Sequence, residues 1–212
     1  MTSRTLRLAL LLLLLAPAVR AEEPEDARVA GARDVVRSTV DEVLAVLAHK
    51  DWPSEQRIQA IEAIAFQRFD FPLISRLVLA QSYRRFDEQQ RVEFVEEFKN
   101  HLSRSYGSRI DRYEQEQVEI TGARLESRGD VTVLTRIVGG DADGIEMHYR
   151  LRENKGQWMM IDVVIEGVSL VSNFRSQFKE VVHKGGPELL LEKLRDKNTS
   201  FDTPTGAKAQ ES

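Results

Sequence analysis

The chain has 212 residues and no cysteine, and its 34 acidic against 30 basic residues give a net charge of −4 at neutral pH. This charge balance argues against a protein that binds nucleic acid, and the lack of cysteine excludes a fold held by disulfides. A chain of this length can bury a core large enough to fold without such cross-links.

The first 21 residues have the features of a secretory signal peptide. Arg4 and Arg7 precede an apolar run, and Val19 and Ala21 suit a cleavage site before Glu22. An uncleaved membrane anchor is the alternative, but the run is shorter than the ~20 residues that a spanning helix needs. We therefore expect a cleaved signal peptide at 1–21, a secreted domain at 22–198 and a polar, disordered tail at 199–212.

Apolar residues at helical spacing dominate the first half of the secreted chain. Val36, Val40 and Leu47 recur with the period of an amphipathic helix and predict a first helix that ends near His49. Pro53 suits the first turn of a second helix, because proline lacks the amide hydrogen that an opening turn leaves unpaired.

Two more helices are predicted before the pattern changes. Pro72 fits the opening turn of a third helix, in an unusually apolar segment that starts at Phe69. Asp87, followed three residues later by Gln90, predicts a capping box at the start of a fourth helix. A stripe of apolar residues that includes Phe98 continues this helix.

After residue 113 the apolar residues alternate with polar ones, as in strands with one buried face. Four strands are predicted, at 118–120, 131–137, 145–151 and 158–166. Turns that contain glycine separate them, at 127–130, 139–144 and 154–156. Because turns this short join neighbouring strands that run in opposite directions, the strands should form an antiparallel meander.

Helical spacing returns from 169 to 182, where Gly185 and Gly186 end the helix and Pro187 opens another. The predicted class is therefore α+β: a four-stranded antiparallel twisted sheet with helices before and after it in the chain.

The residue types that usually carry catalysis or bind metal ions form no recognisable constellation. The four histidines are far apart in sequence and lack a second ligand at helical spacing: His49, His101, His148 and His183. The loop 139–144 holds two aspartates but lacks the glycine and glutamate that an EF-hand needs, so it is interpreted as a hairpin turn. We therefore predict no catalytic residue, no metal site and no cofactor.

Asp162 is the one aspartate within the apolar strand 158–166. Burial raises the pKa of a carboxyl group unless the group is paired, and a raised pKa would suit a general base in a cone-shaped enzyme. A structural role is the favoured alternative, because a lone buried charge is very unfavourable. Arg175 and the backbone amides of the turn at 167–169 are the nearest partners in sequence.

The strand 158–166 is otherwise apolar on both faces, so helices are expected to cover both sides of the sheet. Many aromatic and methionine side chains come from the third and fourth helices and the last two strands. Such a set usually forms a core. In a secreted chain without catalytic residues, a sheet covered on both faces also suits a closed apolar cavity.

Two long segments carry a family resemblance: FDFPLISRLVLAQSYRRFDEQQRVEFVEEFKNHLSRSYGSRI at 69–110 and WMMIDVVIEGVSLVSNFRSQFKEVVHKGGPELLLEKLRDKN at 158–198. They resemble the MlaC family of periplasmic toluene-tolerance, or phospholipid-binding, proteins. The likeness extends over residues 28–198. Its most specific part is the pattern W-x-x-x-D-V-x-x-x-G-V-S-L-V-x-N-F-R-x-Q-F in the second segment.

The resemblance implies a fold related to the NTF2-like cone, with added helices around an apolar lipid pocket in the domain at 22–198. It implies a carrier of diacyl phospholipid in the Gram-negative periplasm that maintains outer-membrane lipid asymmetry. The implied partners are an outer-membrane lipoprotein–porin complex and the lipid-binding subunit of an inner-membrane ABC transporter. A hopanoid or another polycyclic lipid is the alternative cargo, and an enzyme with Asp162 as its base is the less favoured alternative function.

The residues expected to line the lipid pocket come from the third and fourth helices, the last two strands and the helix that follows. They are Leu77, Val78, Phe98, Leu102, Met147, Tyr149, Met160, Val168, Val171 and Phe174. Asp162 and Arg175 are expected to have structural roles.

Overall fold

The structure is a computed structural model that describes residues 26–110 and 116–202, so the predicted signal peptide lies outside the described residues. The elements in chain order are α1 (Ala27–Ala48), α2 (Ser54–Arg68), α3 (Phe71–Leu79), η1 (Ala80–Arg85), α4 (Glu88–Ile110), β1 (Gln117–Leu125), η2 (Ser127–Gly129), β2 (Val131–Val138), η3 (Gly140–Ala142), β3 (Met147–Asn154), β4 (Gln157–Ile165), β5 (Val168–Ser169) and α5 (Leu170–Asp202). The α+β prediction is confirmed.

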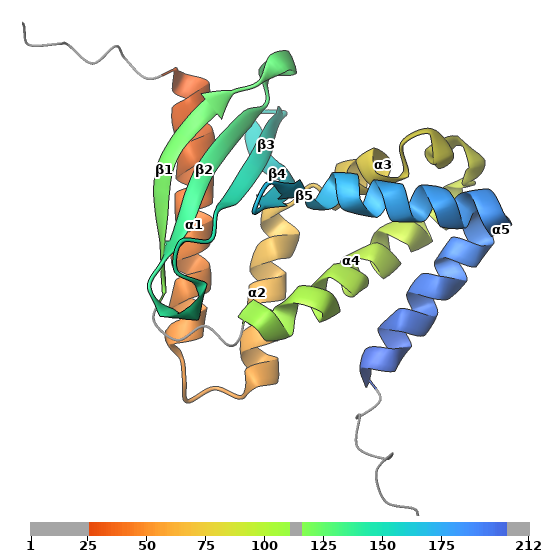
Figure 1. The fold of residues 1–212 in the computed structure, drawn as a ribbon, viewed down its shortest axis with the longest axis horizontal. Helices are drawn as coiled ribbons and strands as arrows, with labels where there is room; N and C mark the ends of the chain where they lie inside the picture. The colour runs from red at the N-terminus through yellow and green to blue at the C-terminus, as the bar shows by residue number, and fades with distance from the viewer. Residues whose placement is uncertain (1–25, 111–115, 203–212) are drawn as a thin grey trace, which may run out of the picture.

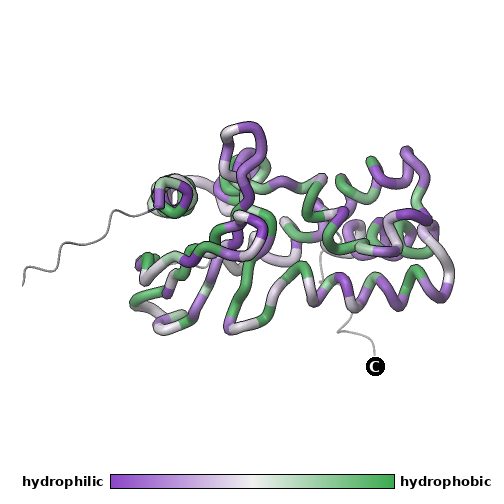
Figure 2. The backbone as a smooth tube through the Cα atoms, turned by 90° about the horizontal axis from the view of Figure 1, so that it is seen from above, coloured by the Kyte–Doolittle hydropathy of each residue, from purple (hydrophilic) through white to green (hydrophobic). Residues whose placement is uncertain are grey.

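The elements form two parts that lie side by side (Figure 1). We call α1, α2 and the strands the sheet lobe, and α3, η1, α4 and α5 the helical lobe. Seen from above, α1 lies over one face of the sheet, while the helical lobe extends away to the side (Figure 2). Within the described ranges, no helix is long and apolar enough to cross a membrane.

The strands form one antiparallel sheet in the order β1-β2-β3-β4-β5, so the predicted meander is confirmed. The predicted number of four strands is wrong, because the short strand β5 pairs with the end of β4. Glu166 and Gly167, both at positive φ, form the tight turn between these two strands. Lys155 and Gly156 have the same backbone conformation at the tip of the β3–β4 hairpin.

The two faces of the sheet differ in polarity. Leu151 and Met160 are opposite each other and face α1. On the other face Asp162 is opposite Arg150, which in turn is opposite Thr132 on β2. Asp162, the one aspartate of β4, therefore belongs to a polar row on that face, and the start of α5 meets it there through a hydrogen bond from the Val171 amide.

The helix starts follow the local sequence signals. Asp70 caps α3, because its Oδ1 accepts a hydrogen bond of 2.9 Å from the Leu73 amide. Asp87 and Gln90 form the predicted capping box, in which each side chain accepts a hydrogen bond from the other residue's backbone amide. The predicted break at Gly185–Gly186 is present as a kink inside α5.

The end of α5 differs from the prediction of a disordered tail that begins at residue 199. The helix continues to Asp202, and the remaining residues of the predicted tail lie outside the described ranges. Packing against α4 holds this last part of the helix. Asn198 is buried there, and its Nδ2 donates a hydrogen bond of 3.0 Å to the Glu97 carbonyl.

Candidate functional site

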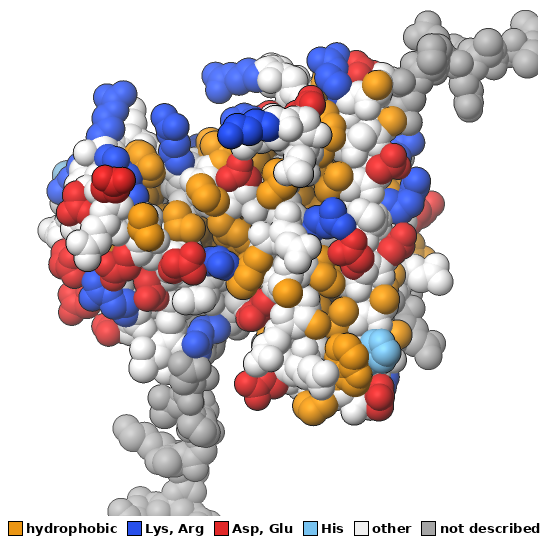
Figure 3. Space-filling model, turned by 180° about the vertical axis from the view of Figure 1, so that it is seen from behind, with side chains coloured by type: hydrophobic (Ala, Val, Ile, Leu, Met, Phe, Trp, Pro, Cys, Tyr) orange, Lys and Arg blue, Asp and Glu red, His pale blue; other side chains and the backbone are white. Residues whose placement is uncertain are grey.

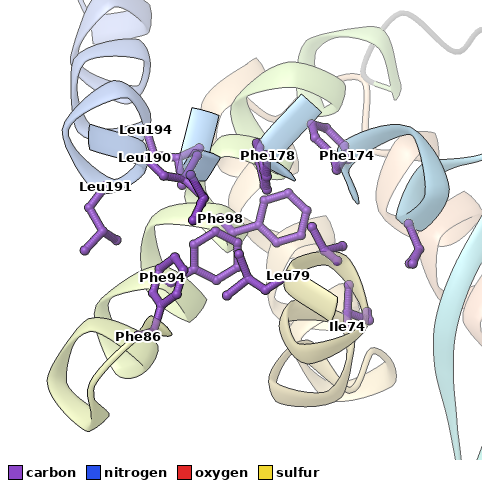
Figure 4. Close-up of a cluster of buried hydrophobic side chains, with 13 residues drawn as sticks. Ile74, Leu79, Phe86, Phe94, Phe98, Phe174, Phe178, Leu190, Leu191 and Leu194 are labelled. Carbon is purple, nitrogen blue, oxygen red and sulfur yellow. The ribbon is translucent and has the colours of Figure 1, made fainter. Parts of the chain in front are cut away.

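Thirteen buried apolar side chains fill the helical lobe (Figure 4). We call this set the helical cluster: Ile74, Val78, Leu79, Phe86, Phe94, Phe98, Val171, Phe174, Phe178, Val182, Leu190, Leu191 and Leu194. Its centre is aromatic because α4 and α5 each place phenylalanines four residues apart, on one helix face. The ring of Phe98 meets those of Phe174 and Phe178 edge-on, with centroids 5.0 and 5.4 Å apart.

His101 extends the helical cluster by one turn of α4. Its ring meets that of Phe174 edge-on at 5.8 Å, and its Nδ1 is buried without a hydrogen-bond partner in the described part of the chain. Burial lowers the pKa of His101 below 6.5, and the positive charge of Lys197 lowers it further. The imidazole is therefore neutral at neutral pH and packs as an apolar ring.

A second set of buried apolar side chains lies between α1 and the sheet. We call it the sheet cluster: Ala32, Val36, Val131, Val133, Leu151 and Met160. Tyr149 packs against it, and its hydroxyl donates a hydrogen bond of 3.0 Å to Met147 Sδ. The residue is only partly buried, but its hydroxyl lies inside, and this burial raises the pKa of Tyr149 to about 12.

Phe69, in the junction between α2 and α3, packs against both clusters. The junction is fixed to the sheet, because Phe69 forms a parallel bridge with Met160 and the Asp70 amide donates a hydrogen bond of 3.0 Å to the Met160 carbonyl. The two apolar interiors therefore meet at one side chain. Viewed from behind, apolar side chains gather between the two lobes (Figure 3).

Asp162 is buried, and both of its carboxylate oxygens accept hydrogen bonds. The Ser169 hydroxyl donates to Oδ2 at 2.6 Å and the Val171 amide donates to Oδ1 at 3.1 Å. The expected pairing with a backbone amide is thus present, but just after the predicted turn. Arg175 is used elsewhere, since its Nε donates a hydrogen bond of 2.9 Å to the Leu77 carbonyl.

These hydrogen bonds tie the Asp162 carboxylate to β5 and to the first turn of α5. A general base must lie within hydrogen-bond reach of a substrate proton, and the two hydrogen bonds described here join both Asp162 oxygens to the protein's own chain. Among the described residues, no group of three or more histidine, aspartate or glutamate side chains is placed to hold a metal ion.

Nine of the ten residues predicted to line a lipid pocket lie in or beside the two clusters. Six belong to the helical cluster or pack against it: Leu77, Val78, Phe98, Leu102, Val171 and Phe174. Met160 belongs to the sheet cluster and Tyr149 packs against it. Met147 accepts a hydrogen bond from the Tyr149 hydroxyl. Val168 lies outside both, because β5 holds it at the sheet edge with 56% of its surface exposed.

Two open hollows lie beside these clusters. The helical hollow, of about 330 Å³, is lined by Pro72, Tyr83, Arg91, Val92, Val95 and Glu96. The junction hollow, of about 380 Å³, lies where α2 and α3 meet the β3–β4 hairpin. It is lined by Phe66, Phe69, Asp70, Pro72, Asn154, Lys155, Gln157 and Met159.

Sequence reasoning missed the junction hollow and the role of Phe69. Phe69 falls between two helices, where periodicity gives no inward face, and its partner Met160 is distant in sequence. The available signal was the run of aromatic residues around Pro72, at a point where the chain must turn.

The comparison with family models gives a match to the family described as MlaC protein, over residues 37–196. The chain belongs to the MlaC family. The toluene tolerance protein ttg2D of Pseudomonas putida is 27% identical over 161 residues, which cover 74% of this chain and 75% of that protein. The recognition of the MlaC family from the two quoted segments is therefore confirmed.

A solved structure has the same fold as this MlaC family member. It is the phospholipid-binding protein from Ralstonia solanacearum in complex with a phospholipid, with a TM-score of 0.74 and 22% sequence identity. The match covers 81% of this chain and 99% of that one. The arrangement of sheet and helices is thus that of a known MlaC-like fold.

Proposed function

We propose that the protein is a periplasmic carrier that holds a diacyl phospholipid, with its acyl chains between the helical cluster and the sheet cluster. The observation that carries this proposal is the contact of Phe69 with both clusters. Two apolar interiors that meet at one side chain can receive apolar chains between them. Most of the backbone hydrogen bonds that hold each lobe together then remain intact.

The physical requirement for such a carrier is burial of both acyl chains. Each methylene group placed in water is unfavourable by about 0.8 kcal/mol, so two chains with about thirty methylenes would be unfavourable by roughly 24 kcal/mol. A phospholipid therefore does not cross an aqueous compartment unaided. The head group is compatible with water, so the protein needs little polar chemistry beyond the rim of the site.

The comparisons support this cargo and this role. A relative is named for toluene tolerance, and the structural match is a phospholipid-binding protein in complex with a phospholipid. We propose that the chain, exported by its signal peptide, docks on an outer-membrane lipoprotein–porin complex and on the lipid-binding subunit of an inner-membrane ABC transporter. A site with equal affinity in both settings shifts no equilibrium, so the partners must set the direction of transfer.

The hydrogen bonds of Asp162 favour the carrier over the alternative of an enzyme that uses this aspartate as its base. Both carboxylate oxygens are engaged by Ser169 and Val171, which tie β4 to the first turn of α5. A base would need one of those oxygens to face the substrate.

Lipid analysis of the native protein tests the proposal. We expect the mature chain, released from the periplasm without detergent, to contain close to one diacyl phospholipid per molecule when its organic extract is examined by mass spectrometry. A polycyclic lipid in the extract would support the alternative cargo. A folded protein whose extract contains no lipid would contradict the carrier role.

A further inference from the structure

The junction hollow is open to the surface beside a side chain that belongs to both apolar interiors. Phe69 lines the hollow and also packs against the helical and the sheet clusters. The helical hollow lies beside α4 and includes Tyr83 but not Phe69. Of these two hollows, the junction hollow is therefore the one whose lining residues contact both clusters.

The lining of the junction hollow is amphipathic. Its apolar residues are Phe66, Phe69, Pro72 and Met159, from α2, α3, their junction and β4. Its polar residues are Asp70, Asn154, Lys155 and Gln157, three of which belong to the β3–β4 hairpin. This is the distribution that suits a ligand with an apolar chain and a polar, charged head.

From this lining we infer that the junction hollow is the mouth of the lipid site, where acyl chains pass Phe69 and the lipid phosphate lies beside Lys155. The inference rests on the proposed function, because it names the route and the head-group contact of the same cargo. It assigns the apolar half of the mouth to the α2–α3 junction and the charged half to the hairpin.

The hollow is too small to hold a whole diacyl lipid, so the acyl chains must pass Phe69 to reach the space between the clusters. Ligand pockets range from about 300 to 1,000 Å³, and about 380 Å³ lies near the lower end of that range. The hollow can therefore hold only part of a diacyl lipid. The rest of both chains must lie between the clusters, and Phe69 is the side chain that closes this path.

The charge at the rim fits a phosphate. Lys155 is exposed at the hairpin tip, and the positive φ of the tight turn fixes where its stem leaves the backbone. Asp70 lines the α3 side of the same hollow, where its Oδ1 accepts a hydrogen bond from the Leu73 amide and its negative charge keeps a phosphate on the hairpin side. Lys155 is therefore the cation that the mouth offers to an anionic head group.

A single introduced cysteine tests the mouth, because the natural chain has no cysteine that could react instead. Met159→Cys places a thiol in the junction hollow, and Val92→Cys places one in the helical hollow as a matched control. Each full mature chain is treated with fluorescein maleimide and then mixed with vesicles of phosphatidylethanolamine and phosphatidylglycerol that contain a pyrene-labelled phospholipid. The measurement is the labelled phospholipid that elutes with the protein.

We expect the label to abolish the uptake that Met159→Cys shows before labelling, while labelled Val92→Cys keeps the uptake of the unaltered chain. Gln157→Cys, at the exposed rim, serves as a second plug if the label at 159 lowers the thermal stability. Uptake that survives both labels overturns the inference and leaves the proposed function intact. An unaltered chain that neither contains nor acquires lipid overturns the proposed function itself.

The head-group contact has its own test. Lys155→Glu should reduce uptake from these vesicles by about two- to fivefold, the effect of losing one exposed ionic contact, and Lys155→Arg should retain it. Lys193→Glu, at an exposed site on α5, is the matched control and should have no effect. Equal uptake by Lys155→Glu and the control contradicts the contact. A thermal shift with inorganic phosphate alone, absent in Lys155→Glu, would assign the site to free phosphate instead.

Discussion

The helical cluster and the sheet cluster are both buried and apolar, but they are held together differently. The helical cluster is centred on phenylalanine rings from α4 and α5, whereas the buried residues of the sheet cluster are mostly aliphatic. Strands are fixed to one another by backbone hydrogen bonds, while a helix satisfies its own backbone and can shift against its neighbours. We therefore expect the sheet to act as the fixed wall of the proposed lipid site and the helical lobe to adjust.

Truncating one core residue in each lobe should distinguish the fixed sheet from the adjustable helical lobe. These substitutions have the largest expected effect on the free energy of unfolding. Phe98→Ala should lower the free energy of unfolding by about 3–5 kcal/mol, and Leu151→Ala by about 2–5 kcal/mol, because each leaves a cavity. Added phospholipid should restore part of the loss in Phe98→Ala, since acyl chains can occupy space between shifting helices. The measurement is thermal unfolding of delipidated protein with and without lipid.

Leu151→Ala is the matched control for this test, because Leu151 is also fully buried but lies between hydrogen-bonded strands. If lipid raises the thermal stability of both variants equally, or only that of Leu151→Ala, the helical lobe is not the more adjustable of the two.

Substitution of Asp162 tests the link between the lobes, with a smaller expected effect. Asp162→Asn removes the negative charge and replaces one acceptor oxygen with a donor, so the Ser169 hydroxyl must accept a hydrogen bond where it donated one. We expect a loss of about 1–2 kcal/mol in the free energy of unfolding, because hydrogen bonds to a charged group contribute more than those between neutral groups. Lipid per folded chain, measured on the same sample, should not change. A variant that keeps its stability and its lipid but is inactive in cells would favour a catalytic Asp162.

The pH dependence of stability should also differ between the lobes. Burial holds the pKa of His101 below its unfolded value of 6.5, so its contribution is present above that pH and is lost as the pH falls through the folded pKa. Tyr149 has the opposite sign: its pKa is raised from 10.0 to about 12, so stability falls as the pH rises between these values.

Urea unfolding measured across the pH range checks whether stability falls on the acid side because of His101 and on the alkaline side because of Tyr149. His101→Phe, which keeps a ring against Phe174, should flatten the acid side of the profile, and Tyr149→Phe should flatten the alkaline side. An acid profile that is unchanged in His101→Phe would show that other groups control the acid loss of stability.

Most of the fold could be predicted because its signals are local. The capping pair Asp87 and Gln90, the hairpin glycines and the break at Gly185–Gly186 all act within a few residues of where they stand. The two-residue strand β5 was missed because it is too short to show any alternation. The helical end of α5 was missed because Asn198 depends on a distant contact with Glu97.

The candidate site could be predicted only in part, because periodicity finds inward faces but not which interior each face enters. Phe98 and Met160 were both expected at one pocket, yet they lie in separate clusters. Val168 was expected to face inward, but the turn at Gly167 returns the chain along the sheet edge and exposes it. The place of Phe69 could not be predicted from periodicity, because Phe69 lies between two helices and is positioned by a bridge to Met160.

The bridge between Phe69 and Met160 also protects the sheet against association with other chains. Together with β5, the Phe69–Asp70 segment occupies the outer edge of β4, where main-chain groups would otherwise be unpaired. Unpaired strand edges readily add a strand from another molecule, which is a common beginning of aggregation. If lipid passage draws this segment away from β4, an open chain bares that edge until it closes again. Rapid closure would therefore limit the addition of a strand from another molecule at this edge.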